Sequence, residues 1–193
     1  DHIWRLKKRV CRGLRRFARD SVASDMRWMA LIVFVTSTAF AAAQQRVEVF
    51  EDDRMLWSEM VLHVENGVVR QGRDWRGQVI WTTRPEKIFE GYSTSAFDLR
   101  YSVREGQLIQ GDSHFSDAVM YTSEWSGNEI KLYIGDSTFP LDLVYTLRPH
   151  AFDEGVFGLF KEESISTFDR ICVFRGLPTA VELFALLLAQ GLL

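Results

Sequence analysis

The residues best suited to do chemistry form a pair that recurs along the chain, a serine followed five residues later by an aspartate. The pair occurs as Ser93 with Asp98, Ser137 with Asp142 and Ser164 with Asp169. Ca²⁺ prefers carboxylate oxygens, so aspartates at one position of a repeated structure could form a cation-binding rim. The same residue types also fasten turns by hydrogen bonds, which every repeat would need. We favour the structural role and keep the calcium site as the alternative.

Other catalytic or metal-binding patterns have little support in the sequence. His63, His114 and His150 lie in unrelated contexts without the spacing of zinc ligands. The chain has neither a G-x-S-x-G nucleophile motif nor a phosphate-binding loop. We therefore predict no catalytic residue, no metal and no cofactor.

Aromatic and sulfur side chains each have two interpretations. The four tryptophans in the strand-rich region could line a sugar or lipid site, but aromatic residues in strands more often belong to the core; they are Trp57, Trp75, Trp81 and Trp125. Cys172 falls in an apolar segment, and we expect a buried, inert thiol there rather than a reactive one.

The elements that position these residues follow from an internal repeat. An aromatic residue followed by a hydroxyl residue returns at spacings of 20, 20 and 24, as Trp81-Thr82, Tyr101-Ser102, Tyr121-Thr122 and Tyr145-Thr146. In three copies a serine precedes the tyrosine by eight residues, and these serines are Ser93, Ser113 and Ser137. Looser copies occur around Asp74 and around Ser164, where Cys172 takes the tyrosine position. Five copies predict a repeat architecture.

Each copy is typical of a β-hairpin. A short apolar run leads to a turn rich in Gly, Ser and Asp, and the following run alternates with period two. Leu99 and Tyr101 then share one face, as do Leu143 and Tyr145, and we expect both pairs to point inward. The pattern predicts about ten strands in a closed sheet, because closure removes exposed edges.

The last residues predict a helix over 179–190. Thr179 and Glu182 have the spacing of a capping box. The segment that follows has no polar face, which favours burial on all sides, and it is too short to span a bilayer. We expect this helix inside the barrel, with Leu183, Phe184, Leu186 and Leu187 in the core.

The segments "IFEGYSTSAFDLRYSV", "IQGDSHFSDAVMYTS" and "IGDSTFPLDLVYTL" resemble the repeats of bacterial β-flower proteins, usually called four-fold β-flower domains. The resemblance runs from about Arg46 to the C-terminus. It implies a shallow, pseudo-symmetric barrel of hairpin petals around an apolar helix, similar in outline to tubby-like and scramblase-like folds. The chain departs from the repeat at Ala118, where the motif has Asp, and at Cys172, where it has Tyr. The resemblance implies no settled biochemical function.

The N-terminal region predicts export. Residues 26–43 combine a basic start, an apolar run and the small residues Ala41-Ala42-Ala43, the pattern of a signal peptide cleaved near Ala43. Residues 1–25 are interpreted as an upstream basic extension outside the mature protein, with a basic nucleic-acid-binding arm as the rival. The sequence therefore predicts one mature domain over 44–193, in the periplasm or outside the cell.

Removing residues 1–43 changes the charge balance. Nine of the 23 Lys and Arg lie there but only three of the 26 Asp and Glu, so the remainder carries 14 basic and 23 acidic residues, a net charge of −9. An acidic domain is poorly matched to nucleic acids or an anionic membrane. Cys11 leaves with the signal, so Cys172 stands alone and we expect no internal disulfide.

Two functions remain after these exclusions. The first is a non-catalytic envelope module, monomeric, that binds a lipid-like ligand, a membrane component or a protein partner; its link to other barrels is an analogy of fold. The second is a hydrolase of envelope glycans or lipids, in which rim carboxylates act as acid and base.

Overall fold

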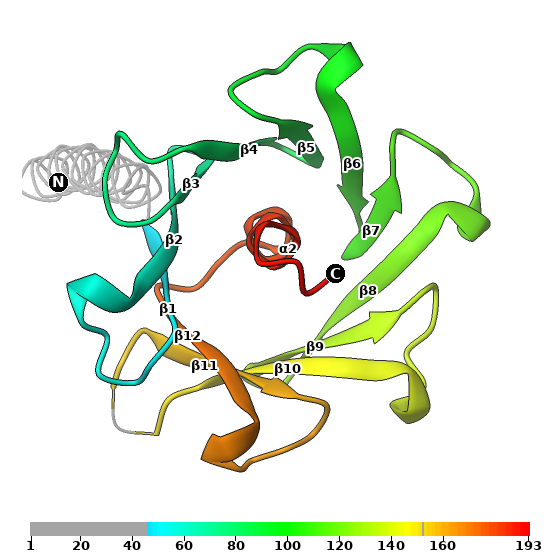
Figure 1. Cartoon of the computed structure of the whole chain (residues 1–193). Coiled ribbons are helices and arrows are strands. Elements are labelled where there is room, and N and C mark those ends of the chain that lie inside the picture. The colour runs from blue at the N-terminus through cyan, green and yellow to red at the C-terminus, as the bar shows by residue number, and fades with distance from the viewer. Residues whose placement is uncertain (1–45, 152) are drawn as a thin grey trace, which may run out of the picture. The chain divides into compact units, whose positions relative to one another are not determined.

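The structure, a computed structural model, describes residues 46–151 and 153–193. The predicted signal peptide and the upstream extension lie outside these residues. In the described part, twelve antiparallel strands close a barrel in which each strand pairs with its neighbours in the sequence, and β12 pairs with β1 (Figure 1). The expectation of a mainly β, closed barrel is confirmed, with two strands more than the sequence suggested.

The strands pair into six hairpins, here called petals, whose outer loops form the tips. The petals are β1 (Val47–Phe50) with β2 (Met60–Glu65), β3 (Val68–Gln71) with β4 (Val79–Arg84), β5 (Lys87–Glu90) with β6 (Leu99–Arg104), β7 (Gln107–Gln110) with β8 (Val119–Ser126), β9 (Glu129–Ile134) with β10 (Leu143–Pro149), and β11 (Val156–Lys161) with β12 (Arg170–Arg175). Five outer loops end in a short 3₁₀ helix: η1 (Trp57–Glu59), η2 (Ala96–Asp98), η3 (Ser116–Ala118), η4 (Pro140–Asp142) and η5 (Thr167–Asp169).

Every petal contains a register shift, whereas the pairs between petals run without one. A bulge adds one residue to one strand, which bends the hairpin and changes which residues share a face. Leu99 and Leu143 are therefore not part of the central core cluster, although Tyr101 and Tyr145 pack against it. The expectation that Leu99 and Leu143 join Tyr101 and Tyr145 at the central core is therefore wrong, although Leu143 is itself buried.

Two-residue turns connect the first five petals in order. The turn before β7 has Glu105 and Gly106 at φ 50° and 81°. A Cβ on Gly106 would lie 2.6 Å from the carbonyl oxygen of Ser123 on β8, so both the left-handed backbone and the close approach require glycine.

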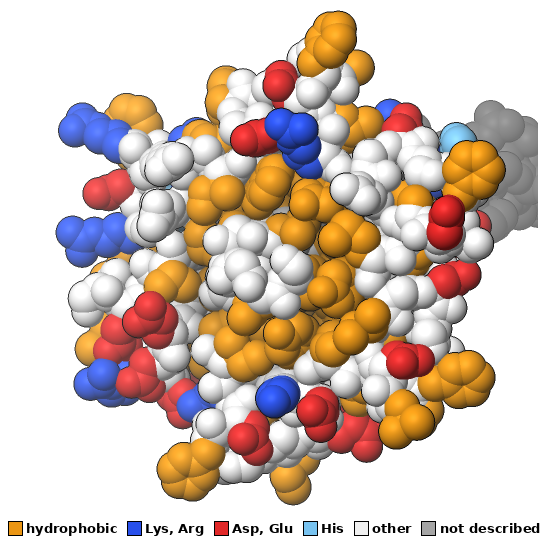
Figure 2. All heavy atoms as spheres, turned by 45° about the vertical axis from the view of Figure 1, so that its right-hand side comes forward, with side chains coloured by type: hydrophobic (Ala, Val, Ile, Leu, Met, Phe, Trp, Pro, Cys, Tyr) orange, Lys and Arg blue, Asp and Glu red, His pale blue; other side chains and the backbone are white. Residues whose placement is uncertain are grey.

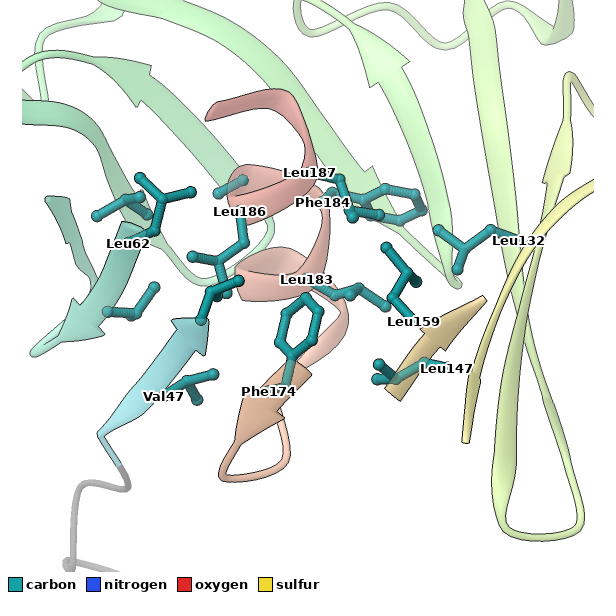
Figure 3. Close-up of a cluster of buried hydrophobic side chains, with 14 of the residues drawn as sticks. Val47, Leu62, Leu132, Leu147, Leu159, Phe174, Leu183, Phe184, Leu186 and Leu187 are labelled. Atoms are coloured by element: carbon teal, nitrogen blue, oxygen red, sulfur yellow. The ribbon is translucent and has the colours of Figure 1, made fainter. Parts of the chain in front are cut away.

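The C-terminal helix α2 (Ala180–Ala189) runs through the middle of the barrel (Figure 1). Thr179 caps it, its Oγ1 accepting from the Glu182 amide while the Glu182 carboxylate accepts from the Thr179 amide, as the capping box predicts. Leu183, Phe184, Leu186 and Leu187 are completely buried and point to strands on different sides of the barrel (Figure 3). The helix fills the core that a barrel of this size would otherwise leave open.

Among the described residues, no helix has the length and apolar character needed to cross a membrane.

Candidate functional site

The predicted Ser–Asp pairs are hydrogen bonds within single petals. The hydroxyl of Ser93 donates to Asp98 at 2.6 Å, that of Ser137 to Asp142 at 2.5 Å, and that of Ser164 to Asp169 at 2.6 Å. Each serine oxygen also accepts from a backbone N–H two residues further on, at 3.1 Å. We call this arrangement the petal latch. It ties the start of the outer loop to the 3₁₀ helix that ends it.

Two petals carry an altered latch. In the β7–β8 petal, Ser113 still accepts from the Phe115 amide at 3.1 Å, but Ala118 occupies the aspartate position. In the β1–β2 petal, Arg54 takes the serine position and Glu59 the aspartate position, and the two form an ion pair at 2.6 Å. This petal is not recognisable as a copy of the repeat in the sequence, because the side-chain types change while the five-residue spacing remains.

The latch aspartates do not gather at a common point. Each one is bonded to a serine of its own petal, and the described residues contain no group of three His, Cys, Asp or Glu side chains able to hold a metal ion. The geometry therefore supports the fastening role of these carboxylates more than a calcium rim.

A second set of hydrogen bonds joins neighbouring petals. The residue after each aromatic donates its hydroxyl to the carbonyl at the start of the next outer loop; the pairs are Thr82 with Gly91, Ser102 with Gly111, Thr122 with Gly135 and Thr146 with Glu162, at 2.6–2.7 Å. In β2 the buried ring of His63 takes this place, 2.6 Å from the carbonyl oxygen of Gly72. The conspicuous dipeptide is thus a structural joint, and His63 belongs to it.

The aromatic member of each dipeptide packs against the central core. Trp81, Tyr101, Tyr121 and Tyr145 are half-buried there, and the rings of Trp81 and Tyr101 meet edge to face at 5.9 Å. The Tyr145 hydroxyl donates to the Leu192 carbonyl at 3.2 Å, and burial raises the pKa of Tyr145. We call these four residues the aromatic column; they pack against the central core, and Tyr145 contacts the chain just after the helix.

The aromatic column is interrupted on one side of the barrel. Leu62 in β2 and Cys172 in β12 occupy the corresponding positions, and these two strands flank β1. Both are buried, and burial raises the pKa of the Cys172 thiol to about 12, as expected for an inert cysteine.

A cavity of about 590 Å³ opens at this interruption, between the end of the helix and the strands β2, β3, β4 and β12. We call it the mouth pocket. Its apolar wall includes Val61, Leu62, Ile80, Ile171 and Leu192. Glu51 and the side-chain amides of Gln71, Gln78 and Gln190 supply its polar groups. A pocket of this size that combines an apolar wall with several polar groups suits a small amphiphilic molecule.

The petal tips expose large apolar side chains. Tyr92, Phe97, Phe115, Leu141 and Phe168 are each at least 75% exposed, and Trp75 is 70% exposed. Figure 2 shows single apolar side chains projecting at the edge of the molecule, apart from those gathered in the middle of the visible face. Trp57, Trp75 and Trp125 are thus exposed rather than part of the core, whereas Trp81 packs against it.

A closed barrel of bulged hairpins with an internal apolar helix defines the class of protein: a repeat barrel of petals. The sequence pattern of the 6-fold beta flower protein family matches residues 49–176, and the chain belongs to that family. The expected β-flower resemblance is confirmed at this level, but the matching family is six-fold, and the barrel has six petals rather than the four implied by the usual family description. Similarity to tubby-like and scramblase-like folds remains a prediction.

Other comparisons add little. The chain is similar to the X-ray structure of a protein from Arabidopsis thaliana, at 14% identity over 78% of this chain and 89% of that chain, with a TM-score of 0.40. A search of curated proteins finds no match.

Proposed function

We propose that this protein is an exported, non-catalytic module of the cell envelope that binds a hydrophobic ligand in the mouth pocket. The observation that carries the proposal is the position of the pocket: it opens where the aromatic column is interrupted by Leu62 and Cys172. Where one site of a regular repeat departs from the residue types that the fold uses elsewhere, a functional role at that site is favoured. The remaining column positions hold aromatic rings that pack against the core.

The hydrolase alternative receives less support. The carboxylates expected to act as acid and base are hydrogen-bonded to serines in separate petals. A general acid–base pair needs two groups within reach of one substrate bond.

A neutral fluorescent probe tests the ligand-binding proposal. N-phenyl-1-naphthylamine should gain fluorescence on binding the full chain, and Ile171→Glu should abolish that gain, because it places a charge in the apolar wall. Ser116→Glu, on the exposed η3 helix, is the matched control and should bind normally. Circular dichroism must show that both variants are folded. Equal binding by both would refute the mouth pocket as the site.

The export part of the proposal has a separate test. Fused to a reporter that is active only outside the cytoplasm, residues 26–60 should give activity, and the mature N-terminus should fall within about two residues of Gln44. A cytoplasmic product that retains residues 26–43 would refute export while leaving ligand binding untouched.

Exposed apolar side chains at the petal tips favour an additional contact with a membrane component or a protein partner. Replacing Phe97 and Phe168 by Ser should then reduce recovery of the protein with isolated envelopes, with no effect on probe fluorescence.

A further inference from the structure

The polar groups of the mouth pocket restrict the kind of head group that it can hold. Three of them are the neutral amides of Gln71, Gln78 and Gln190, each of which offers both a donor and an acceptor. The fourth is the carboxylate of Glu51, which only accepts when ionised. No Lys, Arg or His lines the pocket among the residues that the structure describes.

The amides are available to a ligand. Gln190 uses its Oε1 to accept from the Cys172 thiol at 3.6 Å, which leaves its amide NH₂ without a partner in the described chain. The side chains of Gln71 and Gln78 are exposed and likewise make no hydrogen bond within the described residues. Hydroxyl and amide groups of a ligand can both donate to and accept from such partners.

Charge works against an anionic ligand. A carboxylate or phosphate head group would face Glu51 with no cation to pair with, in a domain whose residues 44–193 already carry a net charge of −9. A cationic head group would gain one exposed partner, and exposed ion pairs contribute about 0–1 kcal/mol. Neutral hydrogen-bonding groups match three of the four polar side chains.

We propose that the mouth pocket binds a single-chain amphiphile with an uncharged head group that carries hydroxyl or amide groups. The alkyl chain lies against Ile80, Ile171 and Leu192, and the head group hydrogen-bonds to the glutamine amides. This inference rests on the proposed function and adds the chemical class of the ligand.

Calorimetric titration of the full chain at pH 8 tests the inference with three probes of equal chain length, each below its micelle concentration. The probes are 1-monolauroylglycerol, laurate and dodecylamine. We expect monolauroylglycerol to bind severalfold more tightly than laurate and no more weakly than dodecylamine. Laurate binding as tightly as monolauroylglycerol, or dodecylamine binding more tightly than monolauroylglycerol, would overturn the inference.

Two variants connect the selectivity to the named residues. Glu51→Gln removes the charge from an exposed side chain and should strengthen laurate binding severalfold, with little change for monolauroylglycerol. Gln78→Leu should weaken monolauroylglycerol binding severalfold, with an unchanged circular dichroism spectrum. Unaltered affinities in both variants would contradict the assignment of the head group to these residues. If neither the naphthylamine nor any of the three amphiphiles binds, the proposed function itself fails, which separates the two failures.

Discussion

At the scale of single residues, the same side chains that suggested chemistry turn out to hold the loops in place. Ser137 donates to Asp142 and accepts from the Phe139 amide, so one hydroxyl fixes both ends of its loop. The five-residue spacing identifies the pair in the sequence, but it does not show whether the aspartate carboxylate binds the serine or a cation. Only the separation of the petals distinguishes the two, and separation is a property of the folded barrel.

Asp142→Ala should lower the free energy of unfolding by about 1–2 kcal/mol, because the half-buried Ser137 hydroxyl loses a charge-assisted hydrogen bond. Asp117→Ala serves as control. Asp117 is an exposed aspartate in the corresponding 3₁₀ helix η3, and its replacement should change stability by less than about 0.5 kcal/mol. Urea unfolding measures both. Unchanged stability together with loss of Ca²⁺ binding would show a metal site instead.

The β7–β8 petal permits the converse experiment. Ala118→Asp places the missing carboxylate five residues after Ser113 and should stabilise the protein by about 0.5–1.5 kcal/mol, the net value of one such hydrogen bond. The measurement is the urea midpoint of the single variant against the parent protein. A lowered midpoint would mean that this loop does not accept the latch geometry.

Because Cys172 is buried, we expect the free energy of unfolding to fall at alkaline pH. Burial raises its pKa from 9.0 to about 12 in the folded chain, so above pH 9 the unfolded thiol ionises while the folded thiol stays neutral. The stabilisation is complete below pH 9 and is lost as the pH rises towards 12, by up to about 1.4 kcal/mol per pH unit. Unfolding free energies at pH 8, 9, 10 and 10.5 should therefore fall more steeply for the parent than for Cys172→Ala. Parallel curves would show that the thiol is accessible and titrates normally.

At the scale of elements, the sequence predicts where most hairpins lie but not which of their side chains point into the core. The aromatic–hydroxyl dipeptide located β4, β6, β8 and β10 because each of these strands uses the hydroxyl for a hydrogen bond to the next petal and the aromatic ring for packing against the core. The same pattern does not identify the β1–β2 petal, because Leu62 and His63 replace both members of the dipeptide. The bulges could not be predicted either. One added backbone residue changes which side chains share a face of the sheet, and the alternation of residue types in the sequence does not show it.

The hydroxyl joints between petals are open to a direct test. Thr146 is completely buried and donates to the Glu162 carbonyl at 2.7 Å. Thr146→Val keeps the shape but leaves that carbonyl without its donor, and should cost about 1–3 kcal/mol. Thr146→Ser keeps the hydroxyl and loses only a methyl group, so it should cost about 1 kcal/mol or less. Equal losses in the two variants would show that Thr146 contributes to stability through packing and not through the hydrogen bond.

At the scale of the whole molecule, the apolar helix is the component that the repeats cannot provide for themselves. Inward side chains from all round the barrel, among them Val47, Leu132, Leu147 and Phe174, point towards α2 (Figure 3). The sequence predicted this because a helix without a polar face must be surrounded. It could not predict the mouth pocket, which depends on which two strands lie on either side of β1 once the barrel has closed.

Removing the helix should therefore destroy the domain rather than shorten it. Leu186 is completely buried, and a charge there would have no partner, so Leu186→Asp or deletion from Pro178 onward should give unfolded or aggregated protein. Leu186→Met keeps the volume and is the control, with a cost below about 1.5 kcal/mol. Circular dichroism and gel filtration decide between the possibilities. A truncated chain that stays monomeric, rich in β structure and cooperative in melting would show that the petals close without the helix, and the helix would then be free to act in binding rather than in holding the barrel together.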